Sequence, residues 1–169
     1  MKALILLALL VFTSADISKE FQDFSKDLLA KFKINEGFDL LIKALNEADE
    51  KFWKASIESI HLIDWGKDDI EDVMRAVRVE TGGVALILAK VFMHSKEKKR
   101  IYEIIENIGK IINDEKEFIK EVEGKKEKVV KSIEKLVEHW KGNKPKDAGE
   151  EAGEFIKWFY LNEKSQLYT

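Results

Sequence analysis

The sequence predicts an all-α fold from its few helix breakers, its residue types and its apolar spacing. It has one proline and nine glycines in 169 residues. Leucine, isoleucine, lysine, glutamate and alanine dominate, all compatible with helix, and no segment alternates with the period of two that is typical of a half-buried strand. Apolar residues instead recur at spacings of three and four, which place them on one face of a helix. We expect a bundle of about six amphipathic helices.

The first fifteen residues are typical of a secretory signal peptide. Lys2 precedes an unbroken apolar run over residues 3–12, and the small residues Thr13 and Ala15 stand three and one positions before a predicted cleavage after Ala15. A helix that spans a bilayer needs about 20 apolar residues, so this run is too short. A buried or interfacial N-terminal helix is the alternative. We therefore expect a protein that is secreted or lies in the lumen of the secretory pathway.

The remaining residues, 16–169, have the length of a single helical domain that can bury a core without disulfides or metals. The chain has no cysteine, which excludes disulfides, thiol catalysis and thiolate metal sites. Its 29 basic and 32 acidic side chains are interspersed and sum to a formal net charge of −3. This balance argues against a nucleic-acid partner. No second segment is long and apolar enough to cross a membrane, so we expect no transmembrane segment after signal removal.

Apolar stripes predict the helices of the first half of the domain. The first helix is expected over residues 17–33, the second has Asn35 as its predicted N-cap, and a third is expected to end at Gly66. Their apolar faces consist of Ile17, Phe21, Phe24, Leu28 and Phe32, then Phe38, Leu41, Ile42 and Leu45, then Phe52, Trp53, Ile57, Ile60 and Ile63.

The fourth predicted helix begins at an N-cap aspartate, Asp68 or Asp69. Its apolar rhythm continues through Gly82 and Gly83, so the pair is expected to be a bend within one helix rather than a loop. The residues that carry this rhythm are Ile70, Met74, Val77, Thr81, Val84, Leu88 and Val91.

Residues 101–140 carry the strongest periodicity, a heptad pattern that two polar residues, Glu115 and Lys126, interrupt. One continuous helix of this length would measure about 60 Å and would project from a domain with a radius of gyration of about 15 Å. We therefore expect a long helix or a helix pair with a break or bend near Gly124. An intramolecular bundle is favoured over a self-associating coiled coil. The positions of the pattern are Ile101, Ile105, Ile108, Ile112, Glu115, Ile119, Val122, Lys126, Val129, Ile133, Leu136 and Trp140.

A turn over residues 142–145 precedes the last predicted helix, which starts near Lys146. Gly149 and Gly153 lie four residues apart, each directly after or beside an alanine, and form a smooth strip. Small side chains let a neighbouring helix approach closely. We expect this strip to pack within the molecule.

The sequence predicts no catalytic, cofactor-binding or metal-binding residue. Its histidines, His61, His94 and His139, lie in different segments without a second histidine three or four residues away. The acids near residue 70 lack the alternating oxygen ligands and central glycine of a calcium loop and suit a helix N-terminus. They are Asp68, Asp69, Glu71 and Asp72.

The four tryptophans are candidates for a ligand pocket, although aromatic residues at helical spacing usually pack a core. They are Trp53, Trp65, Trp140 and Trp158.

Residues 139–143 (His-Trp-Lys-Gly-Asn) and 148–155 (Ala-Gly-Glu-Glu-Ala-Gly-Glu-Phe) resemble the ending of a family of small secreted helical proteins abundant in ciliates. Residues 60–69 are similar in style to the helix junctions of that family, and the signal peptide also matches. Members usually carry cysteines, whereas this chain has none. The resemblance implies secretion and an all-helical fold, and it implies no activity.

These observations favour a secreted, non-enzymatic protein with a structural or protein-interaction role, such as cargo of secretory vesicles or of a surface coat. The sequence does not decide whether the protein also self-associates through its helices. The alternative is a carrier that holds a small apolar ligand or lipid between amphipathic helices.

The leader makes a direct prediction about processing. The exported protein should begin at Asp16, because cleavage is expected after Ala15. Intact-mass spectrometry of the exported protein checks this, and a mass that includes Met1 would contradict it.

Overall fold

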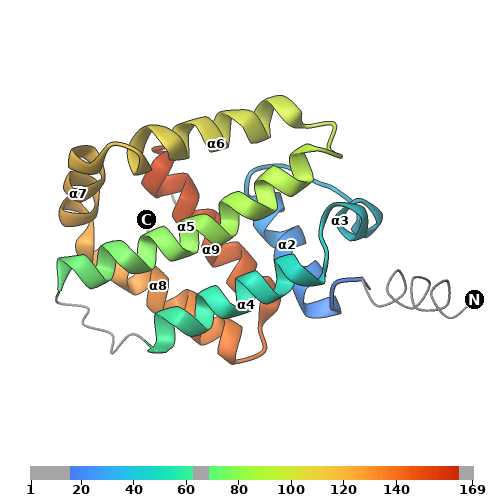
Figure 1. The fold of residues 1–169 in the computed structure, drawn as a ribbon, viewed down its shortest axis with the longest axis horizontal. Coiled ribbons are helices and arrows are strands. Elements are labelled where there is room, and N and C mark those ends of the chain that lie inside the picture. The colour runs from blue at the N-terminus through green and yellow to red at the C-terminus, as the bar shows by residue number, and fades with distance from the viewer. Residues whose placement is uncertain (1–15, 63–68, 164–169) are drawn as a thin grey trace, which may run out of the picture.

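The computed structural model describes residues 16–62 and 69–163, and the predicted signal peptide lies outside this part. The described residues form eight helices and no strand, which confirms the all-α prediction, although only about six helices were expected. None of these helices is long and apolar enough to cross a membrane. With the labels of Figure 1, they are α2 (Lys19–Lys31), α3 (Phe38–Ala44), α4 (Glu47–Leu62), α5 (Ile70–Phe92), α6 (Lys98–Ile112), α7 (Glu115–Gly124), α8 (Lys126–Lys141) and α9 (Pro145–Tyr160).

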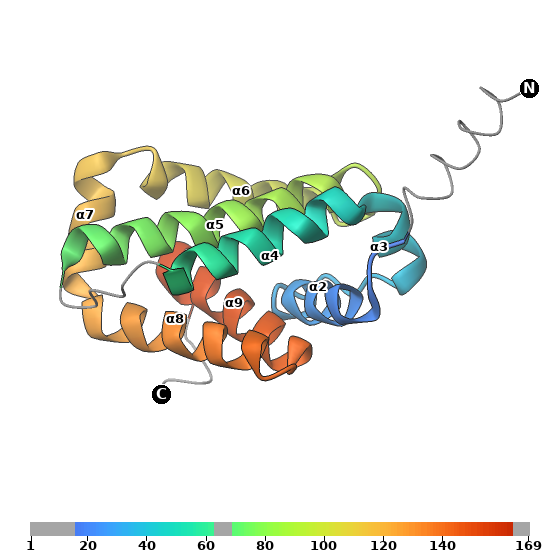
Figure 2. The ribbon, with the colours of Figure 1, turned by 60° about the horizontal axis from the view of Figure 1, so that its bottom comes forward.

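The helices lie in two layers. Figure 2 shows α4, α5 and α6 side by side in one layer and α2, α9 and α8 in the other. Helix α7 connects the layers at one end, and α3 lies at the other end. The longest helix, α5, packs against its neighbours α4 and α6 and against α8 and α9 of the opposite layer. The core lies between the layers, where the apolar stripes of the helices meet.

Helix α2 confirms its predicted stripe, because all five apolar residues of that stripe are buried. Its N-cap is Ser18, whose hydroxyl accepts a hydrogen bond from the N–H of Phe21. The predicted N-cap of the next helix, Asn35, is wrong, because α3 begins after Gly37. Ile34 is buried and its N–H donates to the carbonyl of Leu29. The chain is therefore still completing the end of α2 where the sequence predicted a new start.

Helix α5 is continuous through the glycine pair, and Asp69 caps it by accepting a hydrogen bond from the N–H of Glu71. The two glycines differ in their surroundings. A Cβ atom on Gly82 would meet nothing within 4 Å, whereas one on Gly83 would lie 2.6 Å from Cε3 of Trp53. Gly83 therefore makes room for the Trp53 indole, and the lack of a side chain is needed for packing rather than for a turn.

The heptad-patterned segment forms three helices, so the predicted long helix or helix pair is wrong. The break near Gly124 is present, since α7 ends there and α8 begins at Lys126. A further break separates α6 from α7 at Asp114, whose carboxylate accepts a hydrogen bond from the N–H of Glu117. An acid followed three residues later by glutamate is a helix-start signature that the apolar pattern concealed.

The buried faces of these three helices also depart from one heptad line. Ile104 and Phe118 are fully buried but lie outside the pattern, whereas Ile105, Ile112 and Ile119 within it are only partly buried. A break lets each helix turn its own apolar face toward the core, so one continuous register no longer applies. The heptad residues that are buried are Ile101, Ile108, Val122, Val129, Ile133 and Leu136.

The contact between α2 and α9 confirms the expected close packing of the glycine strip. A Cβ atom on Gly149 would overlap the carbonyl oxygen of Phe24, and one on Gly153 would lie 2.7 Å from Cβ of Lys31. The backbone of α9 thus rests almost directly on α2. Pro145 starts α9 at its first turn, where the missing N–H is not needed.

Substitution of Gly149 should separate these helices. We expect Gly149→Leu to lower the free energy of unfolding by about 1–3 kcal/mol, because the side chain would overlap the α2 backbone. Gly82→Ala is the matched control. It lies in a helix with open space around it and should raise the free energy by about 0.5–1 kcal/mol. Urea denaturation measures both, and a neutral Gly149→Leu variant would contradict the close contact.

Candidate functional site

The histidines do not converge in the described residues. His94 is exposed beyond the end of α5, and His139 is partly buried near the end of α8. His61 belongs to α4, and its side chain lies outside the described part. Within residues 16–62 and 69–163, no group of three or more histidine, cysteine, aspartate or glutamate side chains could hold a metal ion.

The tryptophans separate into two clusters. The Trp53 ring stacks on Phe24 with 4.4 Å between centroids, and Trp140 meets both rings edge-on at 6.0 and 5.4 Å. Trp158 instead packs against Phe155, and Trp65 lies outside the described residues. The structure therefore brings Trp53 and Trp140 together, but their rings contact one another as part of the core.

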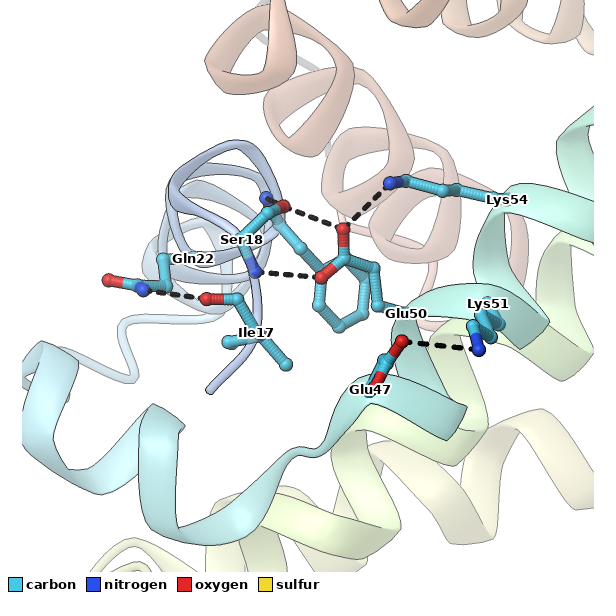
Figure 3. Close-up of polar contacts among 8 residues, drawn as sticks. Ile17, Ser18, Gln22, Glu47, Glu50, Lys51 and Lys54 are labelled. Atoms are coloured by element: carbon cyan, nitrogen blue, oxygen red, sulfur yellow. Dashed lines mark hydrogen bonds and ion pairs between the residues drawn. The ribbon is translucent and has the colours of Figure 1, made fainter. Parts of the chain in front are cut away.

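A polar site lies at the junction between the start of α2 and α4. It is formed by Ser18, Glu50 and Lys54 (Figure 3). The carboxylate of Glu50 accepts hydrogen bonds from the N–H of Ser18 at 2.7 Å and from its hydroxyl at 2.6 Å. Nζ of Lys54 lies 2.8 Å from the same carboxylate. We call this group the N-terminal junction. It ties the first residues of the domain to α4.

The electrostatics of the N-terminal junction favour an ionised Glu50. Burial alone would raise the pKa of the Glu50 carboxyl, but the hydrogen bonds from Lys54 and Ser18 outweigh burial and hold that pKa below its usual value. Next to it, Ile17 is buried, and its carbonyl accepts a hydrogen bond from the side-chain amide of Gln22 at 3.0 Å. The chain is thus anchored within two residues of Asp16.

A second polar group lies between α2 and α9. Its carboxylate, Glu154 of α9, is fully buried and contacts Lys31 of α2. Nζ of Lys31 lies 3.0 Å from the Glu154 carboxylate and 3.3 Å from that of Glu150. Lys157 adds a longer contact of 3.7 Å to Glu154. Burial lowers the pKa of Lys31, but the two carboxylates outweigh burial, so the net pKa is raised and the ammonium is favoured.

A third polar group joins α5 to α9. The hydroxyl groups of Thr81 and Tyr160 are hydrogen-bonded at 2.7 Å, and burial raises the pKa of Tyr160. The neighbouring Glu80 is fully buried, and neither of its carboxylate oxygens has a hydrogen-bond partner among the described residues. Burial, with a smaller effect from Glu151, raises the pKa of Glu80 well above its usual value.

Sequence reasoning did not single out these carboxylates, and for Glu80 a signal was available. Glu80 lies four residues after Ala76 and four before Val84, both fully buried, so it belongs to the inner face of α5. A glutamate at that spacing indicates a carboxyl on the core side of the helix. The acids near residue 70 have the structural use expected of them, since Asp69 is the N-cap, while Asp68 lies outside the described residues.

Comparison of the chain with protein-family models, with curated proteins and with solved structures gives no match.

The N-terminal junction makes a prediction about stability. Glu50→Gln keeps the size of the side chain but removes the charge, so we expect the free energy of unfolding at neutral pH to fall by about 1–3 kcal/mol. Because the folded pKa of Glu50 is lowered, its contribution is present above the ordinary pKa and is lost as pH falls through the lowered one. Urea denaturation at several pH values measures this contribution.

Glu47→Gln provides the control for that experiment. Glu47 pairs with Lys51 on the same helix, but both side chains are well exposed, so its loss should change the free energy by less than about 0.5 kcal/mol. Equal effects of the two substitutions would show that the junction adds nothing beyond an ordinary surface ion pair.

Proposed function

We propose that this chain is a secreted, non-enzymatic helical protein with a structural or protein-interaction role, as cargo of secretory vesicles or of a surface coat. The observation that carries the proposal is that the apolar faces of the helices pack against one another. Heptad residues such as Ile101, Val129 and Leu136 are buried within a single chain. Such a protein meets its partners through its outer surface.

Two further observations support secretion and the bundle. Residues 1–15 have the charge, apolar run and small residues of a signal peptide. The polar interruptions of the heptad pattern, Glu115 and Lys126, stand at helix starts rather than inside a seam, and Glu115 is exposed. The resemblance to small secreted proteins of ciliates points in the same direction, and membership of that family is part of the proposal.

A carrier of a small apolar ligand or lipid is the second candidate, and one observation favours it. The indole N–H of Trp53 is buried and has no hydrogen-bond partner among the described residues. A ligand with an acceptor atom between α2, α4 and α8 could take that hydrogen bond. We rank this candidate second because Phe24 and Gly83 already cover the Trp53 ring.

Native mass spectrometry of the protein purified from its source separates the two candidates. We expect a monomer with the mass of the processed chain, because the apolar faces are already buried. A co-purifying apolar ligand would favour the carrier, and a concentration-dependent, elongated oligomer in sedimentation would contradict the intramolecular bundle.

A double substitution sharpens the same experiment. Replacing Glu115 and Lys126 by leucine should leave the wild-type stoichiometry unchanged, because both positions begin helices of one bundle. In a coiled-coil assembly, the same change would remove buried polar residues and alter the oligomeric state.

A further inference from the structure

Glu80 is the least expected side chain in the interior. It lies near the middle of α5 on the face that carries Ala76 and Val84, and none of the three has exposed surface. Neither carboxylate oxygen has a hydrogen-bond partner in the described part of the chain. An ionised carboxylate without a partner is strongly disfavoured in such surroundings, so the group takes up a proton instead.

Among the described residues, the one charged group that acts on Glu80 is Glu151, and it has the same sign. Glu151 of α9 is itself buried, and its charge opposes ionisation of Glu80. The hydroxyl of Tyr160 in α9 is hydrogen-bonded to that of Thr81. An ionised Glu80 would oppose ionisation of this phenol as well. Arg78, two residues before Glu80, is exposed and lies over the ring of Phe118 at 4.7 Å, and its charge acts on the phenol of Tyr160.

We propose that Glu80 makes the contact between α5 and α9 dependent on pH, so that the two helices pack closely while Glu80 is protonated and loosen when it loses its proton. The contact is a sensitive place for such a change. Glu80 and Thr81 belong to α5, Glu151 and Tyr160 belong to α9, and all four are buried where the two layers meet. A new negative charge on Glu80 would be repelled by Glu151 and would disturb the neighbouring Thr81–Tyr160 hydrogen bond.

The sign of the effect follows from the direction of the pKa shift. The folded state raises the pKa of Glu80 above its ordinary value of 4.5, so the folded chain holds this proton at pH values where the unfolded chain has lost it. The stabilisation is complete below pH 4.5 and is lost as pH rises toward the folded pKa. Acid therefore favours close packing of α5 and α9 through Glu80. Through Glu50 it has the reverse effect, because acid removes the stabilisation that the Glu50 carboxylate provides.

The test compares the purified wild-type protein with Glu80→Gln, which mimics a protonated side chain, and with Glu71→Gln. Glu71 is exposed on the first turn of the same helix and serves as the matched control. Urea denaturation above pH 4.5 should show that the unfolding equilibrium constant of the wild type rises more steeply with pH than that of Glu80→Gln. The difference should approach tenfold per pH unit until the folded pKa is reached. Parallel profiles for wild type and Glu80→Gln would overturn the proposal, as would a flattened profile in Glu71→Gln.

Hydrogen exchange locates the effect. After correction for the intrinsic pH dependence of exchange, amides of α5 and α9 should lose protection at high pH in the wild type and keep it in Glu80→Gln. Amides of α6, which does not contain the buried acids, should respond less. A uniform loss of protection over all helices would show that the change is not centred on the α5–α9 contact, and it would overturn the proposal.

Infrared spectroscopy keeps the proposal testable even when Glu80→Gln does not fold. A carboxylic-acid carbonyl band that persists in Asp27→Asn after the ordinary glutamates have ionised supports a protonated Glu80, since Asp27 is the other carboxyl with a raised pKa among the described residues. Its absence at every pH above 4.5 would overturn the proposal.

Discussion

The close approach of α2 and α9 is the constraint on which the rest of the structure depends. Gly149 and Gly153 let the α9 backbone lie on α2, and this contact buries most of α9 between α2, α8 and α5. Helix α9 thus serves as the centre of its layer. A helix in that position is surrounded by protein, so the polar residues that it carries must find partners or protons inside the molecule.

Buried carboxyls on the neighbouring helices face the same requirement, as Glu50 of α4, Glu154 of α9 and Glu80 of α5 show. Glu50 stays ionised because two donors of Ser18 and the ammonium of Lys54 satisfy it. Glu154 pairs with Lys31, whose side chain the glycine strip brings close to α9. Glu80 has neither arrangement among the described residues and must hold a proton instead. The first two support the fold at neutral pH, whereas the third opposes it as pH rises, so the stability of the protein reflects a balance between them.

Local patterns predicted the features that depend on local spacing. The stripe of α2, the continuity of α5, the break near Gly124 and the packing of Gly149 were all visible in the sequence. The division of residues 101–140 into three helices was not, because apolar spacing stayed regular across the break at Asp114. The partners of the buried glutamates were also beyond reach, since Lys31 and Glu154 are distant in sequence and meet only through the packing of α2 on α9.

The same packing bears on what the molecule can do. In the described part of the chain, the buried heptad residues, Trp53, Trp140, Trp158 and the glycine strip all contribute to internal contacts. The large apolar side chains that remain well exposed are Phe52, Met93 and Tyr102, which lie apart from the buried stripes. Because Glu80 lies where the two layers meet, the charge state of one buried carboxyl decides how firmly α5 and α9 hold those layers, and with them the outer surface, in one shape.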